Sequence, residues 1–285
     1  DQISLRTVPR NFPDRSGTKD DMVYLVSPET AAASALTGKI TDPRDLEMDY
    51  PHVEEPDDII INTDMLHEPL PEAEARDAEI IKGPNIHSIP EFEDLPDEIS
   101  APVALKMGDD ISTDEILRAG AEVLPFRSNI PEISKFTLDV VDPEYYDRAL
   151  HFRDEDDNVQ GHSLVAGGNY GQGSSREHAA LAPRYLGLRF VIATSYARLH
   201  WQNLANFGVI PLEFIERSDL DAIDQGDTLR ITDAREQLQS NADDFEVENV
   251  TKGETFSTRH TLSGRQVRMI LDGGLIEVMK KKLRD

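Results

Sequence analysis

The stretch Gly167-Gly-Asn-Tyr-Gly-Gln-Gly-Ser-Ser-Arg-Glu-His-Ala-Ala-Leu181 decides both the fold and the site. Its glycines permit positive φ angles and close backbone approach, and the residues from Glu177 onward are typical of the opening of a helix. Ser174, Ser175 and Arg176 would then lie at the helix N-terminus. Free backbone N–H groups favour an anion there, and a guanidinium pairs well with a carboxylate. The stretch therefore predicts recognition of a polyacid. The ordinary alternative is a strand–turn–helix connection in which glycine turns the chain and serine caps the helix.

Around this stretch the apolar pattern alternates between strands and helices. Strands are predicted at 103–107, 163–167, 190–194 and 208–212, helices at 176–187 and 197–207, short β segments at 227–231, 245–247 and 254–256, and a closing helix at 263–282 interrupted by Gly273-Gly274. The βαβ order predicts an α/β fold with a mainly parallel central sheet.

The first hundred residues have a different character. Residues 28–38 predict a short helix with Pro near its start and Gly at its end, in a segment, 1–41, that is too small to be a domain. Residues 42–100 hold 19 acids, three bases and eight prolines, which predicts an extended linker. Its apolar run at 57–62 would add one strand or simply dock.

The whole chain is strongly acidic. It has 55 acidic and 29 basic residues, a net charge of −26 and no cysteine. Such a field opposes binding to nucleic acid or to an anionic membrane, so an acidic substrate must be drawn in by local arginines. The acidity resembles that of salt-adapted proteins, with an ordinary acidic enzyme as the equal alternative. No apolar run approaches the roughly 20 residues of a membrane span, and a cytoplasmic location is the default expectation.

The long motif, continued by Pro183-Arg-Tyr-Leu-Gly187, closely resembles the swivel domain of the aconitase superfamily. Other segments extend the resemblance over essentially the whole chain: 10–15, 25–33, 108–116, Phe126-Arg127, 197–203 and 208–212. The resemblance implies that the chain has three parts. Residues 1–41 would end an upstream cluster-bearing α/β domain, 42–100 would be the acidic linker, and 101–285 would be the swivelling β/β/α domain.

The resemblance also implies roles for particular side chains. Ser174 would be the catalytic base and Asp114 a second catalytic residue, although a helix cap is the ordinary role of an aspartate in Ser-Thr-Asp. The residues that would bind substrate are Arg10, Arg15, Arg127, Ser175 and Arg176. Glu115 departs from the family's usual His or Gln. His178 and His200 are interpreted as structural residues, and Trp201 as a packing residue.

The family holds a [4Fe–4S] cluster with three cysteines, whereas this chain has none. We therefore expect no metal ligand in this chain and a cluster ligated by cysteines outside it. The sequence would begin just after the family's last two cluster cysteines, as a fragment, a processed product or a split-gene subunit. The expected partners are a tricarboxylate substrate and cluster-bearing domains, either upstream in cis or on a separate subunit.

The implied reaction is that of an aconitate hydratase-like hydro-lyase of the tricarboxylic acid cycle, which interconverts citrate and isocitrate through cis-aconitate. A dehydratase of isopropylmalate, homoaconitate or 2-methylisocitrate is the alternative enzyme. A non-catalytic swivel-domain fragment or regulatory subunit remains the alternative from another class.

Overall fold

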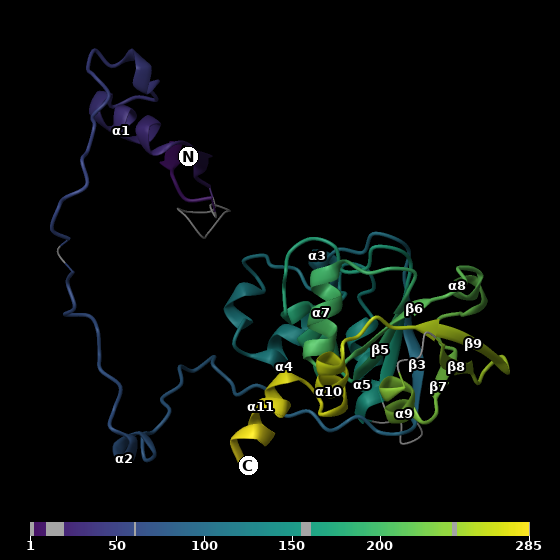
Figure 1. Cartoon of the computed structure of the whole chain (residues 1–285). Coiled ribbons are helices and arrows are strands. Elements are labelled where there is room, and N and C mark those ends of the chain that lie inside the picture. The colour runs from purple at the N-terminus through teal and green to yellow at the C-terminus, as the bar shows by residue number, and fades with distance from the viewer. Residues whose placement is uncertain (1–2, 10–19, 60, 155–160, 241–243, 285) are drawn as a thin grey trace. The chain divides into compact units, whose positions relative to one another are not determined.

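The structure is a computed structural model that describes residues 3–9, 20–59, 61–154, 161–240 and 244–284. The chain divides into two compact units, residues 1–81 and 82–285 (Figure 1). Arg10 and Arg15 lie outside the described residues, so their predicted roles stay predictions.

The first unit is small. Strands β1 (Ile3–Arg6) and β2 (Met22–Leu25) pair in parallel, and helix α1 (Pro28–Thr37) follows. The Ser27 side chain accepts a hydrogen bond from the Thr30 N–H, and Gly38 ends the helix in the left-handed conformation. The predicted helix at 28–38 is thus confirmed, with the cap residues that its ends require.

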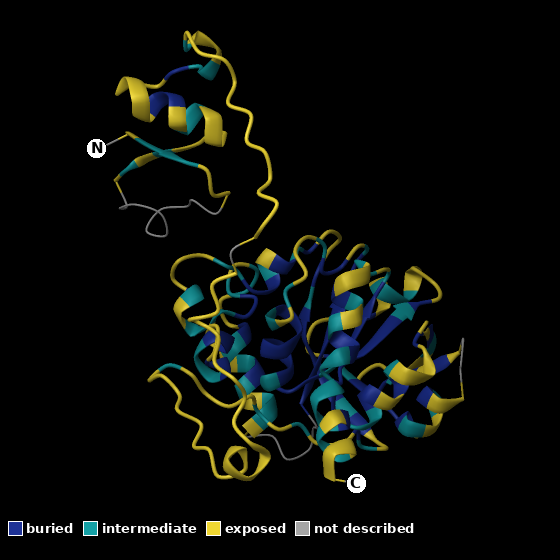
Figure 2. Ribbon diagram, turned by 60° about the vertical axis from the view of Figure 1, so that its left-hand side comes forward, coloured by how far each residue is buried: buried dark blue, intermediate teal, exposed yellow. Residues whose placement is uncertain are grey.

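The described residues that follow α1 in this unit are mostly extended, and their only helices are the short η1 (Pro43–Asp45) and α2 (Glu72–Ala75). Residues 47–59 and 61–81 are exposed, as Figure 2 shows. Of the predicted run at 57–62, residue 60 is not described. Ile59 and Ile61 are 79% and 76% exposed and lie outside any strand. The described residues of the run therefore form no strand and are exposed within their own unit.

The second unit is built on a closed barrel of seven strands in the order β3-β4-β5-β6-β9-β8-β7. Their bounds are β3 (Ile99–Lys106), β4 (His162–Ala166), β5 (Leu188–Ala193), β6 (Ile210–Phe214), β7 (Thr228–Ile231), β8 (Phe245–Asn249) and β9 (Glu254–Arg259). Strands β3 to β6 pair in parallel, as predicted. The antiparallel strands β7 to β9 close the ring by pairing with β6 and β3, a step that the sequence pattern did not predict.

Helices cover the barrel (Figure 1). They are α3 (Thr113–Ile116), η2 (Leu124–Phe126), α4 (Ile130–Ile133), η3 (Ser134–Phe136), α5 (Tyr145–Asp154), α6 (His178–Tyr185), α7 (Arg198–Asn206), α8 (Ser218–Ala222), α9 (Ala234–Gln239), α10 (Gly264–Leu271) and α11 (Leu275–Arg284). The predicted α/β fold class is confirmed. The predicted closing helix consists of the two helices α10 and α11. They are separated at the predicted interruption, where Gly273 and Gly274 both adopt positive φ angles.

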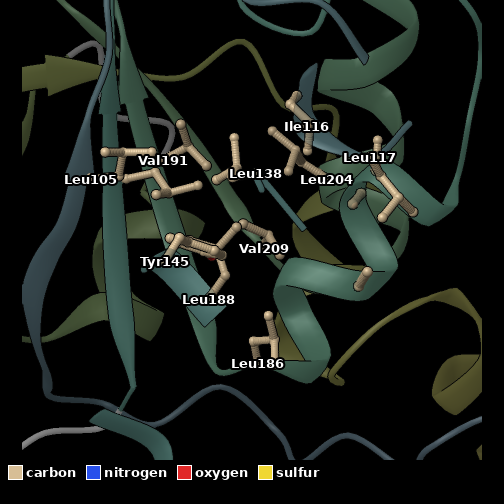
Figure 3. Packing of buried hydrophobic residues seen from close by; sticks show 14 of the residues in the cluster. Leu105, Ile116, Leu117, Leu138, Tyr145, Leu186, Leu188, Val191, Leu204 and Val209 are labelled. Atoms are coloured by element: carbon tan, nitrogen blue, oxygen red, sulfur yellow. The ribbon is translucent and has the colours of Figure 1, made fainter. Parts of the chain in front are cut away.

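Successive residues of a strand point to opposite faces of the sheet, so the apolar side chains of the strands belong to two different clusters. One cluster includes Leu105, Val191 and Leu204, whose side chains point toward a common centre in Figure 3. The other includes Val103 and Ile192. Since both faces of the parallel strands are buried, those strands read as continuous apolar runs in the sequence.

Residues 82–98, the first residues of the second unit, pack on the rest of that unit. The Leu95 N–H donates to the Leu271 carbonyl at 3.0 Å, and the His87 N–H to the Ser128 carbonyl at 2.7 Å. A Cβ at Gly273 would lie 2.6 Å from the Glu93 carbonyl oxygen, so only glycine permits this crossing of backbones.

Salt should stabilise the protein if the charge of −26 is an adaptation to salt. Repulsion among acidic groups acts over a Debye length of about 30 Å at 0.01 M salt and about 3 Å at 1 M. We expect the melting temperature to rise steeply with potassium chloride over this range, and proteolysis at low salt to begin in the exposed residues 46–81. A melting temperature that stays flat, with no early cleavage there, would show that the acidity is ordinary surface composition.

Candidate functional site

The serine loop, residues 167–177, joins the end of β4 to the start of α6. The carboxyl ends of parallel strands meet at one edge of the sheet, and ligands usually bind at that edge. The loops that follow β3 and β5 reach the same edge. The Tyr170 N–H donates to the Ser195 carbonyl at 3.0 Å, and the Tyr170 carbonyl accepts from the Ala197 N–H at 2.9 Å.

The loop after β3 forms backbone hydrogen bonds with the other side of the serine loop. The Gly171 N–H donates to the Ile111 carbonyl at 2.7 Å, and the Thr113 N–H donates to the Gln172 carbonyl at 2.8 Å. Gly171 has a φ of 77°, which favours glycine. These bonds give the loop a fixed backbone between its two neighbours.

Asp109 and Asp110 fasten the beginning of the loop. The Gly168 N–H donates to Asp109 Oδ1 at 2.6 Å, and this bond lowers the pKa of the Asp109 carboxyl, with a smaller contribution from Arg217. The Asn169 side chain donates to Asp110 Oδ1 at 2.9 Å. Asn169 and Asp110 both have positive φ angles, which these residue types tolerate better than most. Sequence reasoning missed these anchors, although Asp-Asp and Asn are residue types suited to such turns.

Asp114 and Arg176 come together, as the resemblance implies for residues of one site. Arg176 Nη1 lies 2.5 Å from Asp114 Oδ1 and also donates to the Leu117 carbonyl at 3.3 Å. The Asp114 side chain is 64% exposed, whereas that of Arg176 is 24% exposed. The pair therefore holds a guanidinium at the surface of the loop, where its remaining N–H groups can meet a carboxylate.

The helix cap of α3 is made by other residues. Ser112 Oγ accepts from the Glu115 N–H at 3.2 Å, and Glu115 Oε2 accepts from the Ser112 N–H at 2.8 Å. This reciprocal capping box occupies Glu115 and leaves the Asp114 carboxylate for Arg176. The ordinary explanation of Asp114 as the capping residue is thus wrong.

The two serines are exposed beside this pair. α6 begins at His178, with Glu177 as its N-cap residue, so Ser174 and Ser175 precede the helix instead of forming its first turn. Among the described residues, neither hydroxyl has a hydrogen-bond partner. Both hydroxyls are available to a ligand.

Arg127 is exposed and directly follows η2. Its carbonyl lies 2.8 Å from His178 Nε2, at the start of α6. The loop that carries Arg127 is therefore adjacent to the serine loop, and His178 acts as the structural link between them.

The described residues contain no group of three or more His, Cys, Asp or Glu side chains placed to hold a metal ion. The whole chain also lacks cysteine. Because [4Fe–4S] clusters are held by thiolates, the residues of this chain do not fit such a cluster.

Among the described residues, no helix is both long and apolar enough to cross a bilayer.

Comparison with known proteins gives concordant results. The family model of the aconitase C-terminal domain matches residues 131–217. A putative mitochondrial aconitate hydratase of Aspergillus fumigatus is 32% identical over 99% of this chain and 40% of its own length. The chain thus spans about two-fifths of that relative.

Shorter relatives match about two-thirds of this chain over nearly their whole length. A 3-isopropylmalate dehydratase small subunit of Archaeoglobus fulgidus is 36% identical over 62% of this chain and 93% of its own length. The crystal structure of a 3-isopropylmalate dehydratase from Methanocaldococcus jannaschii has a TM-score of 0.51 and 29% identity, and the match covers 66% of this chain and 96% of that one.

Proposed function

Because the chain belongs to the aconitase superfamily of hydro-lyases, we propose that its swivel domain supplies the proton-transfer and carboxylate-binding groups of a hydroxy-acid dehydratase. The observation that carries this proposal is the Arg176–Asp114 pair beside the two unpartnered serine hydroxyls. A guanidinium held next to free hydroxyls suits an anionic substrate that must lose a proton.

In this proposal Arg176 and Ser175 bind one carboxylate, and Arg127 binds another. Asp114 keeps Arg176 in place, because a carboxylate paired with one guanidinium nitrogen restricts the rotation of the whole fork. Arg10 and Arg15 are proposed to bind the remaining carboxylate. Arginine suits all four positions, since its planar fork selects the geometry of a carboxylate as well as its charge.

Ser174 is proposed to remove the proton from the substrate carbon. A serine hydroxyl is by itself a very weak base, so its alkoxide must be stabilised by nearby N–H donors and positive charge. The Arg176 guanidinium and the backbone N–H groups of the loop before α6 are the groups in this chain that can do so. Asp114 would balance the charge of Arg176 once the proton has moved.

The proposed substrates are citrate and isocitrate, interconverted through cis-aconitate. Similarity to the fungal aconitate hydratase over 99% of the chain, compared with 62% for the small subunit, supports this choice. A dehydratase of isopropylmalate or homoaconitate is the second candidate, supported by the structural match to 66% of this chain and 96% of the isopropylmalate dehydratase chain. Steady-state kinetics of the full protein with isocitrate and isopropylmalate would decide between them by the ratio of the two kcat/KM values.

Any [4Fe–4S] cluster would be ligated outside these 285 residues, by domains of the same protein or by a partner subunit. Such a cluster would supply the Lewis acid for loss of the substrate hydroxyl. The proposed role of this chain is confined to binding, orientation and transfer of the carbon-bound proton.

The 285-residue chain alone should therefore have no measurable dehydratase activity, because it lacks every thiolate ligand. The measurement is turnover of isocitrate to cis-aconitate, with and without reconstitution by iron and sulfide. Turnover by this chain in the absence of any partner would contradict the assignment of cluster binding to other residues.

A further inference from the structure

His200, in α7, lies directly beneath the serine loop. Its side chain is 1% exposed, and a Cβ built on Gly171 would lie 2.2 Å from its Cγ and Cδ2 atoms. The imidazole ring is therefore in contact with the α-carbon of Gly171. Nothing larger than glycine fits between the ring and the loop.

The same ring contacts the preceding residue of the loop. The rings of His200 and Tyr170 meet edge to face, with centroids 5.2 Å apart and an interplanar angle of 70°. This is a favourable arrangement for two aromatic rings. The Tyr170 carbonyl also accepts a hydrogen bond from Ala197, just before α7, so the start of α7 holds both the side chain and the backbone of the loop.

Hydrogen bonding does not explain the position of His200. Among the described residues, neither ring nitrogen has a partner. Burial lowers the pKa of His200 to about 4, so the ring is neutral near pH 7. Buried polar atoms without partners are unfavourable, and the contact that the ring makes with the loop accounts for its presence.

We propose that His200 is a positioning residue, whose ring acts as a spacer under Gly171 and fixes the loop that carries Ser174 and Arg176. This inference rests on the proposed function of those two residues. The loop backbone beyond Gly171 is paired to Thr113, the neighbour of Asp114. A shift at Gly171 is therefore passed both to Ser174 and to the Arg176–Asp114 pair.

Truncation of the spacer should reduce catalysis more than binding. A misplacement of about 1 Å at a reacting group costs about 10²-fold in rate, so we expect His200→Ala in the full protein to lower kcat about 10²-fold with KM within a few-fold. His200→Asn should keep kcat within about five-fold. Its Cβ, Cγ and one terminal atom match Cβ, Cγ and Cδ2, the three His200 side-chain atoms nearest to a Cβ at Gly171.

His162→Ala is the matched control. His162 is also a fully buried histidine, and burial lowers its pKa to about 3, but it lies at the opposite end of β4 from the loop and its ring bonds to Tyr145. We expect it to lower the melting temperature while leaving kcat of the folded protein within about three-fold. Equal losses of kcat in His200→Ala and His162→Ala, or no loss in either, would show that His200 is only a core residue.

Hydrogen exchange provides a readout that does not depend on activity. Amides of residues 168–173 should lose protection in His200→Ala and keep it in His200→Asn and His162→Ala, measured by mass spectrometry on the full protein. Unchanged protection in His200→Ala overturns the spacer. Lost protection without any dehydratase activity in the parent protein would support the spacer and count against the proposed function instead.

A double-mutant cycle tests the contact from the other side and remains informative if His200→Ala folds poorly. Gly171→Ala adds a Cβ against the ring at φ 77°, whereas Gly173→Ala meets only Thr113 Oγ1, at 3.4 Å, at φ 105°. Gly171→Ala should lower the melting temperature more than Gly173→Ala. The extra loss should persist in the His200→Asn background and shrink with His200→Ala, which keeps only the His200 Cβ, 2.5 Å from the added Cβ. Equal losses for the two glycines would contradict the proposed contact.

Discussion

Ser174→Ala should lower kcat of the proposed dehydratase reaction of the full protein by about 10²–10⁴-fold, the range that a positioned general base contributes. KM should stay within about three-fold, because a group that acts on the transition state contributes little to ground-state binding. The fold should be unaffected, since Ser174 is exposed and its hydroxyl has no partner among the described residues. The measurement is steady-state conversion of isocitrate to cis-aconitate, with melting temperature as the check on folding.

Ser175→Ala is the matched comparison, because it removes a hydroxyl from the same exposed loop one residue away. Its proposed role is to bind a carboxylate, so KM should rise and kcat should fall much less. If the two variants show the same modest loss, the assignment of the base to Ser174 is wrong.

Arg176→Lys should raise KM by about 30-fold or more while the protein remains folded. Lysine keeps the charge but loses the planar fork, which pairs with Asp114 and is proposed to bind a substrate carboxylate. Loss of a well-formed charged contact of this kind costs at least about 2 kcal/mol, and each 1.4 kcal/mol is a factor of ten in affinity. Binding of isocitrate can be measured by KM and by protection against thermal unfolding.

Arg217→Lys controls for the general effect of replacing arginine near the loop. Arg217 pairs with Asp109 at 3.3 Å and is 68% exposed at its side chain, but it has no proposed contact with substrate. It should leave KM within about two-fold. A similar rise in KM for both variants would show that replacing any arginine near the loop weakens binding, and would contradict a specific role for the Arg176 fork.

Local sequence predicted the elements of the site well, since each element carries its own pattern. The strand at 163–167 and the helix at 197–207 appear as β4 and α7 within a residue or so. The start of α6 was less well predicted: Glu177 lies outside the regular helix, which places the serines before it. No pattern within a few residues distinguishes a helical first turn from an N-cap region that bends away.

Contacts between distant segments could not be predicted in the same way. The Asp109 carboxylate accepts from Gly168, Arg184 is buried over the ring of Phe92, and His200 lies under Gly171. Each pair joins segments that no local periodicity relates. The sequence identified His200 as structural but gave no indication of which backbone it supports.

Closure of the barrel has a consequence for synthesis of the chain. β9 is the last strand to be made, and until it pairs, β6 and β8 each have one side without a partner among the described strands. Open strand edges are templates for association with other chains. A nascent polypeptide that ends before Glu254 should therefore need a chaperone or aggregate, and a C-terminal deletion of β9 should give insoluble protein although every residue of the serine loop is still present.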